Sequence, residues 1–460
     1  MNFKMPSGNK HVLLIILAFL SVKLLALGYY HIVWWDSAVS IGMGKYIYSF
    51  GNSGLWEEPR PLVWPLMLGF LWKTGFDAVL AGRILEILFG SLCILMTFLI
   101  GRKLFDEKTA LLGSLFLAVS PAFFFFDGIM LTEIVSAFFA LSAVYLLMSR
   151  KYYTAGLLFG IAFMTRFLQL LAFMAVVFII ITYDKKNIKN IIRLSAAFLI
   201  PVVLYLALNQ ILYHNALLPF LQQIYLSKNT GWLNFQPITY YFAELFKENV
   251  LYLLSFFGIF LVVKEKNSSK MHIAAIFLFF FVFFNLIKQK EMRFLIVLLP
   301  YMYLLLSSSI VYLFGKFENR LHKALLITAI SLSLAYSAYN INAYYQKESG
   351  KVNPYAEMES KFVSSYGRIW ASNPVIAVSG SQKIETLMYY PFFSTGKKNE
   401  LIEGAADADF IFMDSCDLAC RPSDINCENA KAELISHFKK RLKTIHSSSN
   451  NNCQQLVLQG

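Results

Sequence analysis

Long apolar runs separated by short polar segments recur along the first 345 residues of the chain. The runs fall near 12–30, 80–100, 109–126, 134–149, 154–166, 168–183, 194–212, 249–263, 272–287, 294–314 and 323–340. Most are long enough for a helix to cross about 30 Å of hydrocarbon, and the shorter ones would have to tilt or thin the bilayer locally. The pattern predicts an α-helical polytopic membrane domain of about eleven transmembrane helices over residues 1–345.

The periodicity changes from about residue 346 onward. Two short runs, Pro374–Ser379 and Ala408–Met413, have the pattern of strands, and Ala430–Leu442 has that of an amphipathic helix. The Ser/Asn tract 447–452 predicts a flexible loop. We therefore expect residues 346–460 to form a small α/β domain outside the bilayer.

Composition excludes an ordinary soluble protein of this length. Hydrophobic residues make up 57% of the chain and charged residues 15%, against roughly 25% charged residues in typical soluble domains. The mean hydropathy is +0.55. The net charge of +13 could indicate nucleic-acid binding, but the basic residues lie mostly in short loops between apolar runs. Membrane topology explains that placement better, so we expect no nucleic-acid partner.

The distribution of Lys and Arg among the loops predicts the orientation. With the N-terminus placed in the cytoplasm, inner segments hold 17 of these residues and outer segments hold 9. Cytoplasmic loops carry such an excess. An odd number of spans then puts the C-terminal domain outside the cell. We expect a multi-pass protein of the plasma membrane.

Cysteine usage agrees with an extracytoplasmic C-terminal domain. Cys93 lies in an apolar run, whereas Cys416, Cys420, Cys427 and Cys453 all lie in the terminal domain. An even set confined to one exported domain predicts two disulfides, and three pairings are open. A zinc site is the alternative, but the spacing lacks the usual Cys-x2-Cys pair.

The first outer loop, residues 31–79, is the longest connection between predicted spans and is rich in polar groups. It opens with Trp34-Trp35-Asp36 directly after the first apolar run. An acid held at the membrane surface behind two tryptophans is placed to act as a partly desolvated base. The alternative is that Asp36 only caps a helix that begins at Ser37.

Two further acids flank the next outer turn. Asp127 precedes it, and Glu133 begins the following apolar run. A charge near the bilayer centre costs on the order of 2.5–3.5 kcal/mol, so Glu133 should face a polar cavity or a partner. The alternative is that Thr132-Glu133 is only a helix N-terminal signal.

Three cations, Lys288, Lys290 and Arg293, lie in a very short outer turn. The positive-inside rule predicts few cations in such a turn. An anionic ligand at membrane level would explain them, because Lys and Arg bind phosphate and stabilise a departing phosphate. Arg166, at the outer end of another short run, can join the group. The alternative is that these side chains snorkel to lipid headgroups.

Together these residues predict an outward-facing cavity with carboxylates on one side and cations on the other. The arrangement suits transfer from a lipid-phosphate donor: a carboxylate deprotonates the acceptor hydroxyl while cations hold the departing phosphate. The expected phosphate contacts are Lys288, Lys290, Arg293, Arg166 and Arg60. The expected acids are Asp36 and Glu133 in catalysis and Asp127 and Glu58 on the acceptor or metal side.

A transporter or lipid flippase is the alternative from another class, with the acids and cations forming an ion path. No inverted repeat is visible in the sequence, and the acids gather at one membrane face. The chain also lacks a P-loop and a Gly-rich nucleotide motif, so ATP or a nucleotide-sugar donor is unsupported.

Several short motifs carry a resemblance to a known family. In chain order they are Asp36 after the first run, Pro59 to Pro65, Gly82-Arg83, Ser120-Pro121, Leu131-Thr132-Glu133, Met164-Thr165-Arg166, and Lys290-Glu-x-Arg-Phe294 with Pro300. At these residues the chain resembles the GT-C superfamily of glycosyltransferases that use polyprenyl-phosphate sugars. It is similar above all to protein O-mannosyltransferases and lipid A aminoarabinose transferases.

The resemblance implies a reaction and a role for Asp36. The donor would be a polyprenyl- or dolichyl-phosphate sugar, and the sugar a mannose-like hexose. Asp36 would be the general base of an inverting transfer. Two positions depart from the family pattern: Ser37 stands where the family has Glu, and Gln289 where it has His. The missing second acid puts metal-assisted chemistry in doubt, so a divalent metal is compatible with the sequence but not required by it.

Overall fold

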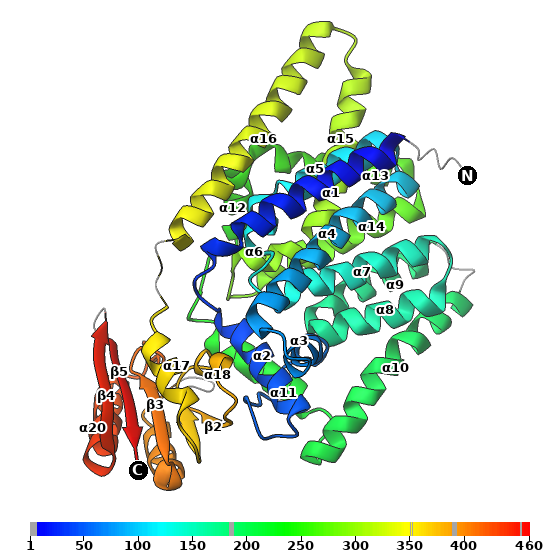
Figure 1. Cartoon of the computed structure of the whole chain (residues 1–460). Coiled ribbons are helices and arrows are strands. Elements are labelled where there is room, and N and C mark those ends of the chain that lie inside the picture. Colours follow the sequence, from blue (N-terminus) through cyan, green and yellow to red (C-terminus); the bar gives the residue numbers. More distant parts are fainter. Residues whose placement is uncertain (1–6, 184–187, 350, 352, 389–392, 451–452) are drawn as a thin grey trace. The chain divides into compact units, whose positions relative to one another are not determined.

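The computed structural model describes residues 7–183, 188–349, 351, 353–388, 393–450 and 453–460. Its contacts divide the chain into two units, which Figure 1 colours by sequence. The first, here the membrane unit, comprises 1–30, 83–217 and 234–350. The second, here the sheet unit, comprises 31–82, 218–233 and 351–460. The first outer loop thus packs with the C-terminal domain rather than with the helices that flank it in sequence.

Helices make up the membrane unit. They are α1 (Ser7–Leu25), α4 (Ala78–Leu104), α5 (Glu107–Ala118), α6 (Pro121–Phe126), α7 (Thr132–Met148), α8 (Tyr152–Thr165), α9 (Leu170–Tyr183), α10 (Ile188–Tyr213), α12 (Tyr240–Glu248), α13 (Leu254–Glu265), α14 (Ser268–Leu286), α15 (Leu299–Lys316) and α16 (Arg320–Ser349). Every apolar run predicted above overlaps at least one of them, so the predicted helical class is confirmed.

Within the described residues, five helical segments are long and apolar enough to cross a membrane: Gly8–Tyr29, Ala78–Leu104, Ile188–Tyr213, Ser268–Leu286 and Arg320–Ser349. Shorter apolar helices lie at Thr132–Met148, Tyr152–Thr165 and Phe167–Tyr183. The number of eleven crossings stays a prediction. Lys4, Lys185 and Lys186, three of the cations counted for orientation, lie outside the described residues.

One predicted run, 109–126, is two helices rather than one. α5 ends at Ala118, and α6 begins at Pro121 with the Ser120 hydroxyl accepting the Phe123 N–H at 3.4 Å. Proline lacks an N–H and favours the first turn of a helix, so it starts α6 instead of continuing α5. The break turns the chain toward the segment that precedes α7.

The sheet unit contains α2 (Trp35–Tyr48), α3 (Val63–Lys73), α11 (Leu218–Thr230), α17 (Ala356–Val363), α18 (Ile376–Ser379), α19 (Lys397–Gly404) and α20 (Cys427–Arg441). Its strands are β1 (Ile369–Ala371), β2 (Ile384–Leu387), β3 (Phe410–Asp414), β4 (Lys443–Asn450) and β5 (Cys453–Gln459). They form one sheet in the order β2-β1-β3-β5-β4. β1 pairs in parallel with β2 and β3, and β5 pairs antiparallel with β3 and β4.

The two faces of the sheet are buried by different helices. Alternate side chains of a strand point to opposite faces. Ile411 of β3 is in the core cluster that contains Leu434 of α20, whereas its neighbour Phe412 is in the cluster that contains Met43 of α2 and Phe362 of α17. The small α/β domain is therefore present as predicted, with α2 of the first outer loop in one of its two cores.

Two local predictions within this domain are wrong. Residues 374–379 were expected as a strand but contain α18, because Pro374 and the Asn373 side chain start a helical turn: the Val375 N–H donates to Asn373 Oδ1 at 3.0 Å. Of the tract 447–452, expected as loop, residues 447–450 belong to β4, and 451–452 lie outside the described residues. Pairing with the apolar strand β5 outweighs the weak strand preference of Ser and Asn.

The four cysteines of the domain form two disulfides. Cys416 is joined to Cys453 and Cys420 to Cys427, one of the three pairings that the sequence left open. Among the described residues, one group has donors close enough to share a metal, Asp414 with Cys416 and Cys453. Its two sulfurs are already joined to each other.

Candidate active site

Glu133 is the centre of a buried charged cluster in the membrane unit. It lies in the first turn of α7, and 1% of its side chain is exposed. Arg166, which follows α8, places Nη1 2.9 Å from Glu133 Oε1. Arg293, in the short 3₁₀ helix η5 (Met292–Val297), places Nε 3.9 Å from the same oxygen. The fold thus joins three residues that the sequence predicted from separate segments.

The two arginines of the cluster differ in their remaining donors. Arg293 Nε lies 2.7 Å from Glu291 Oε2, so its guanidinium group is shared between two glutamates. Arg166 also donates to Thr132 Oγ1 at 3.2 Å, but its buried Nε has no hydrogen-bond partner among the residues that the structure describes. Both guanidinium groups lie over the Phe294 ring, at 5.4 Å and 5.5 Å from its centre. Arg166 therefore keeps donor capacity that a bound anion could use.

A buried carboxylate that the sequence analysis missed, Glu86 of α4, fixes the segment leading to Glu133. Glu86 is fully buried, and its oxygens accept the backbone N–H groups of Gly128 at 2.9 Å and Leu131 at 2.8 Å. They also accept the N–H of Met130. Three such bonds to one carboxylate hold the turn in place just before α7 begins. A lone glutamate inside a long apolar run is the sequence feature that could have identified Glu86 as functionally or structurally important.

A buried lysine, Lys23 of α1, holds the other side of the same segment. Its Nζ donates to the Phe124 carbonyl oxygen at 2.7 Å and to that of Asp127. The Tyr30 and Tyr345 hydroxyls lie 2.8 Å and 3.0 Å from the same nitrogen. The sequence analysis missed Lys23 too, although a lysine near the end of an apolar run is likewise a feature that indicates a buried polar partner.

Asp127 is not in an open site. Its side chain is fully buried, and a Cβ added to Gly90 of α4 would lie 2.7 Å from its carboxylate. The predicted role on the acceptor side therefore has no support in its position. The backbone carbonyl of Asp127, which Lys23 and the Tyr30 hydroxyl bind, is the part that contributes to the site.

The two lysines of the predicted cation turn also differ. Lys290 is 4% exposed, and its Nζ donates to the carbonyl oxygens of Gln236 at 3.0 Å and Ile287 at 2.5 Å. The Lys290 ammonium group therefore connects two backbone segments and is not available to contact a phosphate. Lys288 is exposed, and the described residues show no ion pair for it.

Asp36, in the sheet unit, lies in the first turn of α2. The helix begins at Trp35, one residue before the acid, so Asp36 is not at the cap position. Arg60 Nη1 lies 2.8 Å from Asp36 Oδ1, and Arg60 Nε lies 2.5 Å from Glu57 Oε2. Asp36 and Arg60 are 28% and 27% exposed. Arg60 thus holds the predicted base in one orientation while leaving it open to a substrate.

Two further contacts fix the first outer loop within the sheet unit. The Glu58 carboxylate, expected on the acceptor side, accepts a hydrogen bond from Gln222 Nε2 of α11. Lys45 of α2 donates to the carbonyl oxygens of Ala377 at 3.0 Å and Gly380 at 2.8 Å, at the end of α18. Burial lowers the pKa of Lys45 to about 8, and Asp77 opposes that shift. α2, which carries Asp36, is thereby tied to the sheet.

Comparison with known proteins adds a family match and a fold. The family model described as dolichyl-phosphate-mannose-protein mannosyltransferase matches residues 59–208. Among curated proteins, no sequence matches the chain. The structure of ArnT from Cupriavidus metallidurans in the apo state superimposes with a TM-score of 0.65 at 10% identity, over 98% of each chain. The chain therefore shares the fold of ArnT.

Two other solved structures with this fold hold ligands. ArnT from Cupriavidus metallidurans bound to undecaprenyl phosphate matches with a TM-score of 0.64 at 11% identity, over 97% of each chain. The oligosaccharyltransferase AglB from Archaeoglobus fulgidus, in complex with an inhibitory peptide and a dolichol-phosphate, matches with a TM-score of 0.62 at 12% identity. That match covers 96% of this chain and 74% of AglB. At such identities these matches establish the fold.

The shared fold agrees with the resemblance to GT-C glycosyltransferases inferred from the motifs, and the long apolar helices indicate an integral membrane protein. The family match begins at Pro59, so it includes Arg60, Glu133 and Arg166 but neither Asp36 nor Arg293. The two acids predicted for catalysis lie in different units, and each is paired with an arginine of its own unit.

Proposed function

We propose that this protein is a GT-C glycosyltransferase that transfers a sugar from a polyprenyl- or dolichyl-phosphate donor to a hydroxyl acceptor at the outer membrane face. The observation that carries the proposal is the Glu133–Arg166 pair: a buried acid holds an arginine whose Nε, within the described part of the chain, has no hydrogen-bond partner. A buried, preorganised guanidinium group suits an anion such as a lipid phosphate. The ligands of ArnT and AglB named above support a donor of this kind.

The proposed chemistry is a direct displacement at the anomeric carbon. Asp36 takes the proton of the acceptor hydroxyl as its oxygen attacks, the bond from the anomeric carbon to the phosphate oxygen breaks, and the lipid phosphate leaves as the anion. Arg166 stabilises the negative charge that develops on that phosphate. One displacement inverts the anomeric configuration.

Arg60 and Glu133 have positioning roles in this proposal. Arg60 orients the Asp36 carboxylate, and Glu133 orients the Arg166 guanidinium group. Glu133 is therefore better suited to orient Arg166, the proposed phosphate-binding residue, than to act as a second base, since 1% of its side chain is exposed. The family description supports a mannose-like hexose as the sugar.

The substitution Asp36→Asn tests the catalytic assignment. We expect turnover to fall by about 10²- to 10⁴-fold, the usual contribution of a general base, while donor binding and folding are retained. The measurement is loss of label from polyprenyl-phosphate sugars incubated with the purified full-length protein, together with the configuration of the product.

Glu428→Gln, at an exposed acid of α20, is the matched control and should keep the wild-type rate. Wild-type turnover in Asp36→Asn would refute the role of Asp36, and a product that retains the donor configuration would refute the direct displacement. If no polyprenyl-phosphate sugar lost its label with the wild-type protein, the glycosyltransferase proposal itself would fail.

A further inference from the structure

A cavity of about 250 Å³ lies at the end of α8 remote from Arg166. It is lined by Arg150, Lys151, Tyr152, Tyr153, Thr154 and Arg193. α7 ends at Met148 and α8 returns from Tyr152, so the cavity and the Glu133–Arg166 pair occupy opposite ends of one helical hairpin. The 14 residues of α8 separate the two ends by roughly 20 Å.

The cavity depends on a close crossing of α8 and α10. Gly156 and Gly160 have the Gly-x-x-x-Gly spacing that lets helix backbones approach each other in membranes. A Cβ added to Gly156 would lie 2.1 Å from the Leu194 carbonyl oxygen, and one added to Gly160 would lie 2.6 Å from that of Phe198. Arg193 precedes Leu194 and is therefore carried to the first turn of α8.

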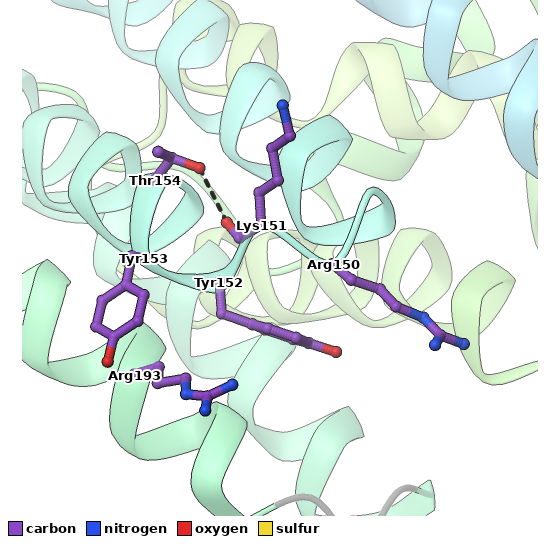
Figure 2. Close-up of a pocket in the computed structure, with 6 residues that line it drawn as sticks. All are labelled: Arg150, Lys151, Tyr152, Tyr153, Thr154 and Arg193. Carbon is purple, nitrogen blue, oxygen red and sulfur yellow. Dashed lines mark hydrogen bonds between the residues drawn. The ribbon is translucent and has the colours of Figure 1, made fainter.

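The lining is strongly cationic. It contains three basic side chains and no acid. In the described part of the chain none of the three forms an ion pair, and all three are exposed. α8 begins without a capping side chain from Lys151, so the partial positive charge of its N-terminus adds to the cations. Figure 2 shows the guanidinium groups of Arg150 and Arg193 on either side of the Tyr152 ring.

We propose that this cavity binds a phosphate-bearing anion, for which the headgroup of an anionic membrane lipid and free phosphate are the two sources. Guanidinium groups offer paired N–H donors that match phosphate oxygens, and basic pockets between membrane helices hold anionic headgroups. The tyrosines suit the depth of the headgroups, where Tyr is enriched. By the predicted orientation this site faces the cytoplasm, away from the proposed transfer site.

The experiment titrates the detergent-purified full-length protein with phosphatidylglycerol, phosphatidylcholine and inorganic phosphate. The variant is Arg150→Gln with Arg193→Gln, and the matched control is Lys264→Gln with Lys266→Gln, two exposed lysines of another turn of the membrane unit. We expect phosphatidylglycerol to bind in preference to phosphatidylcholine. Since each cation near a membrane surface contributes about fivefold, the double variant should lose about 25-fold in affinity and the control should lose none.

The three ligands distinguish the sources. Selective binding of phosphatidylglycerol identifies the lipid headgroup, whereas equal binding of inorganic phosphate, lost in the Arg150/Arg193 variant, identifies free phosphate. Equal affinity of wild type and that variant for both ligands would overturn the proposal, as would an equal loss in the lysine control. Because lipid binding rather than sugar transfer is measured, the result does not depend on the proposed glycosyltransferase activity.

Discussion

Arg166 and Arg293 flank the same carboxylate but should contribute differently to ligand binding. Arg293 Nε lies at ion-pair distance from both Glu133 and Glu291, whereas the buried Arg166 Nε has neither an ion pair nor a hydrogen bond among the described residues. Replacing either by Ala would leave Glu133 buried beside a lost charge, at a cost of about 3–5 kcal/mol in stability. Lysine keeps the charge but loses the planar donor fork, so it is the more informative substitution.

We predict that Arg166→Lys weakens donor binding by about 1.5–3 kcal/mol, the scale of a hydrogen bond to a charged group. Arg293→Lys should have a smaller effect, because its donors are already engaged by two glutamates. The measurement is the affinity of the purified protein for a labelled polyprenyl-phosphate sugar. Lys290→Met is the comparison: its ammonium binds backbone carbonyls, so it should lower stability and leave donor affinity unchanged. Unaltered affinity in Arg166→Lys would contradict the assignment.

Among the elements, the segment between α6 and α7 is held by charges from two other helices. Glu86 of α4 accepts three of its backbone N–H groups, and Lys23 of α1 binds its Asp127 carbonyl oxygen together with that of Phe124 in α6. Glu133 follows directly, so the position of the candidate site depends on side chains that do not belong to it.

The substitution Glu86→Gln tests that dependence. An amide offers one acceptor oxygen and turns N–H donors toward backbone N–H groups, so unsatisfied donors should cost about 1–3 kcal/mol in stability. Thermal unfolding of the full-length protein measures the loss, and donor affinity should fall with it because the turn before Glu133 loosens. Glu318→Gln, at an exposed acid, should change neither quantity. Wild-type stability in Glu86→Gln would show that the turn holds without the carboxylate.

The apolar periodicity was sufficient to predict the helices, because membrane helices need long runs without charge. It failed where local chemistry decides the backbone. Pro121 divides a continuous apolar run, and the capped turn at Asn373 converts an apolar stretch into α18. In β4, pairing with β5 overrides the preference of Ser and Asn for loops. Two of these outcomes depend on single residues and the third on the neighbouring strand, and apolar periodicity encodes none of them.

For the whole molecule, the sequence could predict which charged residues are unusual but not which of them meet. Glu133, Arg166 and Arg293 stand out against the charge pattern, and the fold brings them together. Arg60 was expected on a phosphate, yet it pairs with Asp36. The charge pattern and the predicted topology identify unusual charged residues. Which of these residues form ion pairs depends on packing, which the periodicity does not encode.

The two disulfides should contribute unequally to the stability of the C-terminal domain. Cys416–Cys453 closes a sequence separation of 37 residues and Cys420–Cys427 one of 7. On chain-entropy grounds their removal should cost roughly 4 and roughly 2 kcal/mol. Denaturant unfolding of Cys416→Ser/Cys453→Ser and Cys420→Ser/Cys427→Ser, followed by a probe in this domain, measures both. A larger loss for the shorter loop would contradict this order.

The orientation in the membrane remains to be tested on the intact chain. We predict that cysteine-reactive tags at Ser268 and Asn319 report the cytoplasm and that a tag at Asn399 reports the outside, because cationic loops stay inside. Accessibility to a membrane-impermeant reagent in intact cells distinguishes the two sides. A cytoplasmic signal from Asn399 would contradict both the predicted orientation and the expected oxidising surroundings of the terminal domain.

The buried charges of α1 and α4 also constrain how the ribosome-bound chain is assembled in the bilayer. Lys23 and Glu86 are synthesised before residues 124–131, whose backbone groups bind them. Until then each helix holds a charge without these partners, and a charged side chain in a membrane helix is costly. A nascent chain that ends before α6 would therefore present two poorly tolerated helices to the insertion and quality-control machinery. Both helices become well tolerated only after residues 124–131 have been synthesised and bind the two charges.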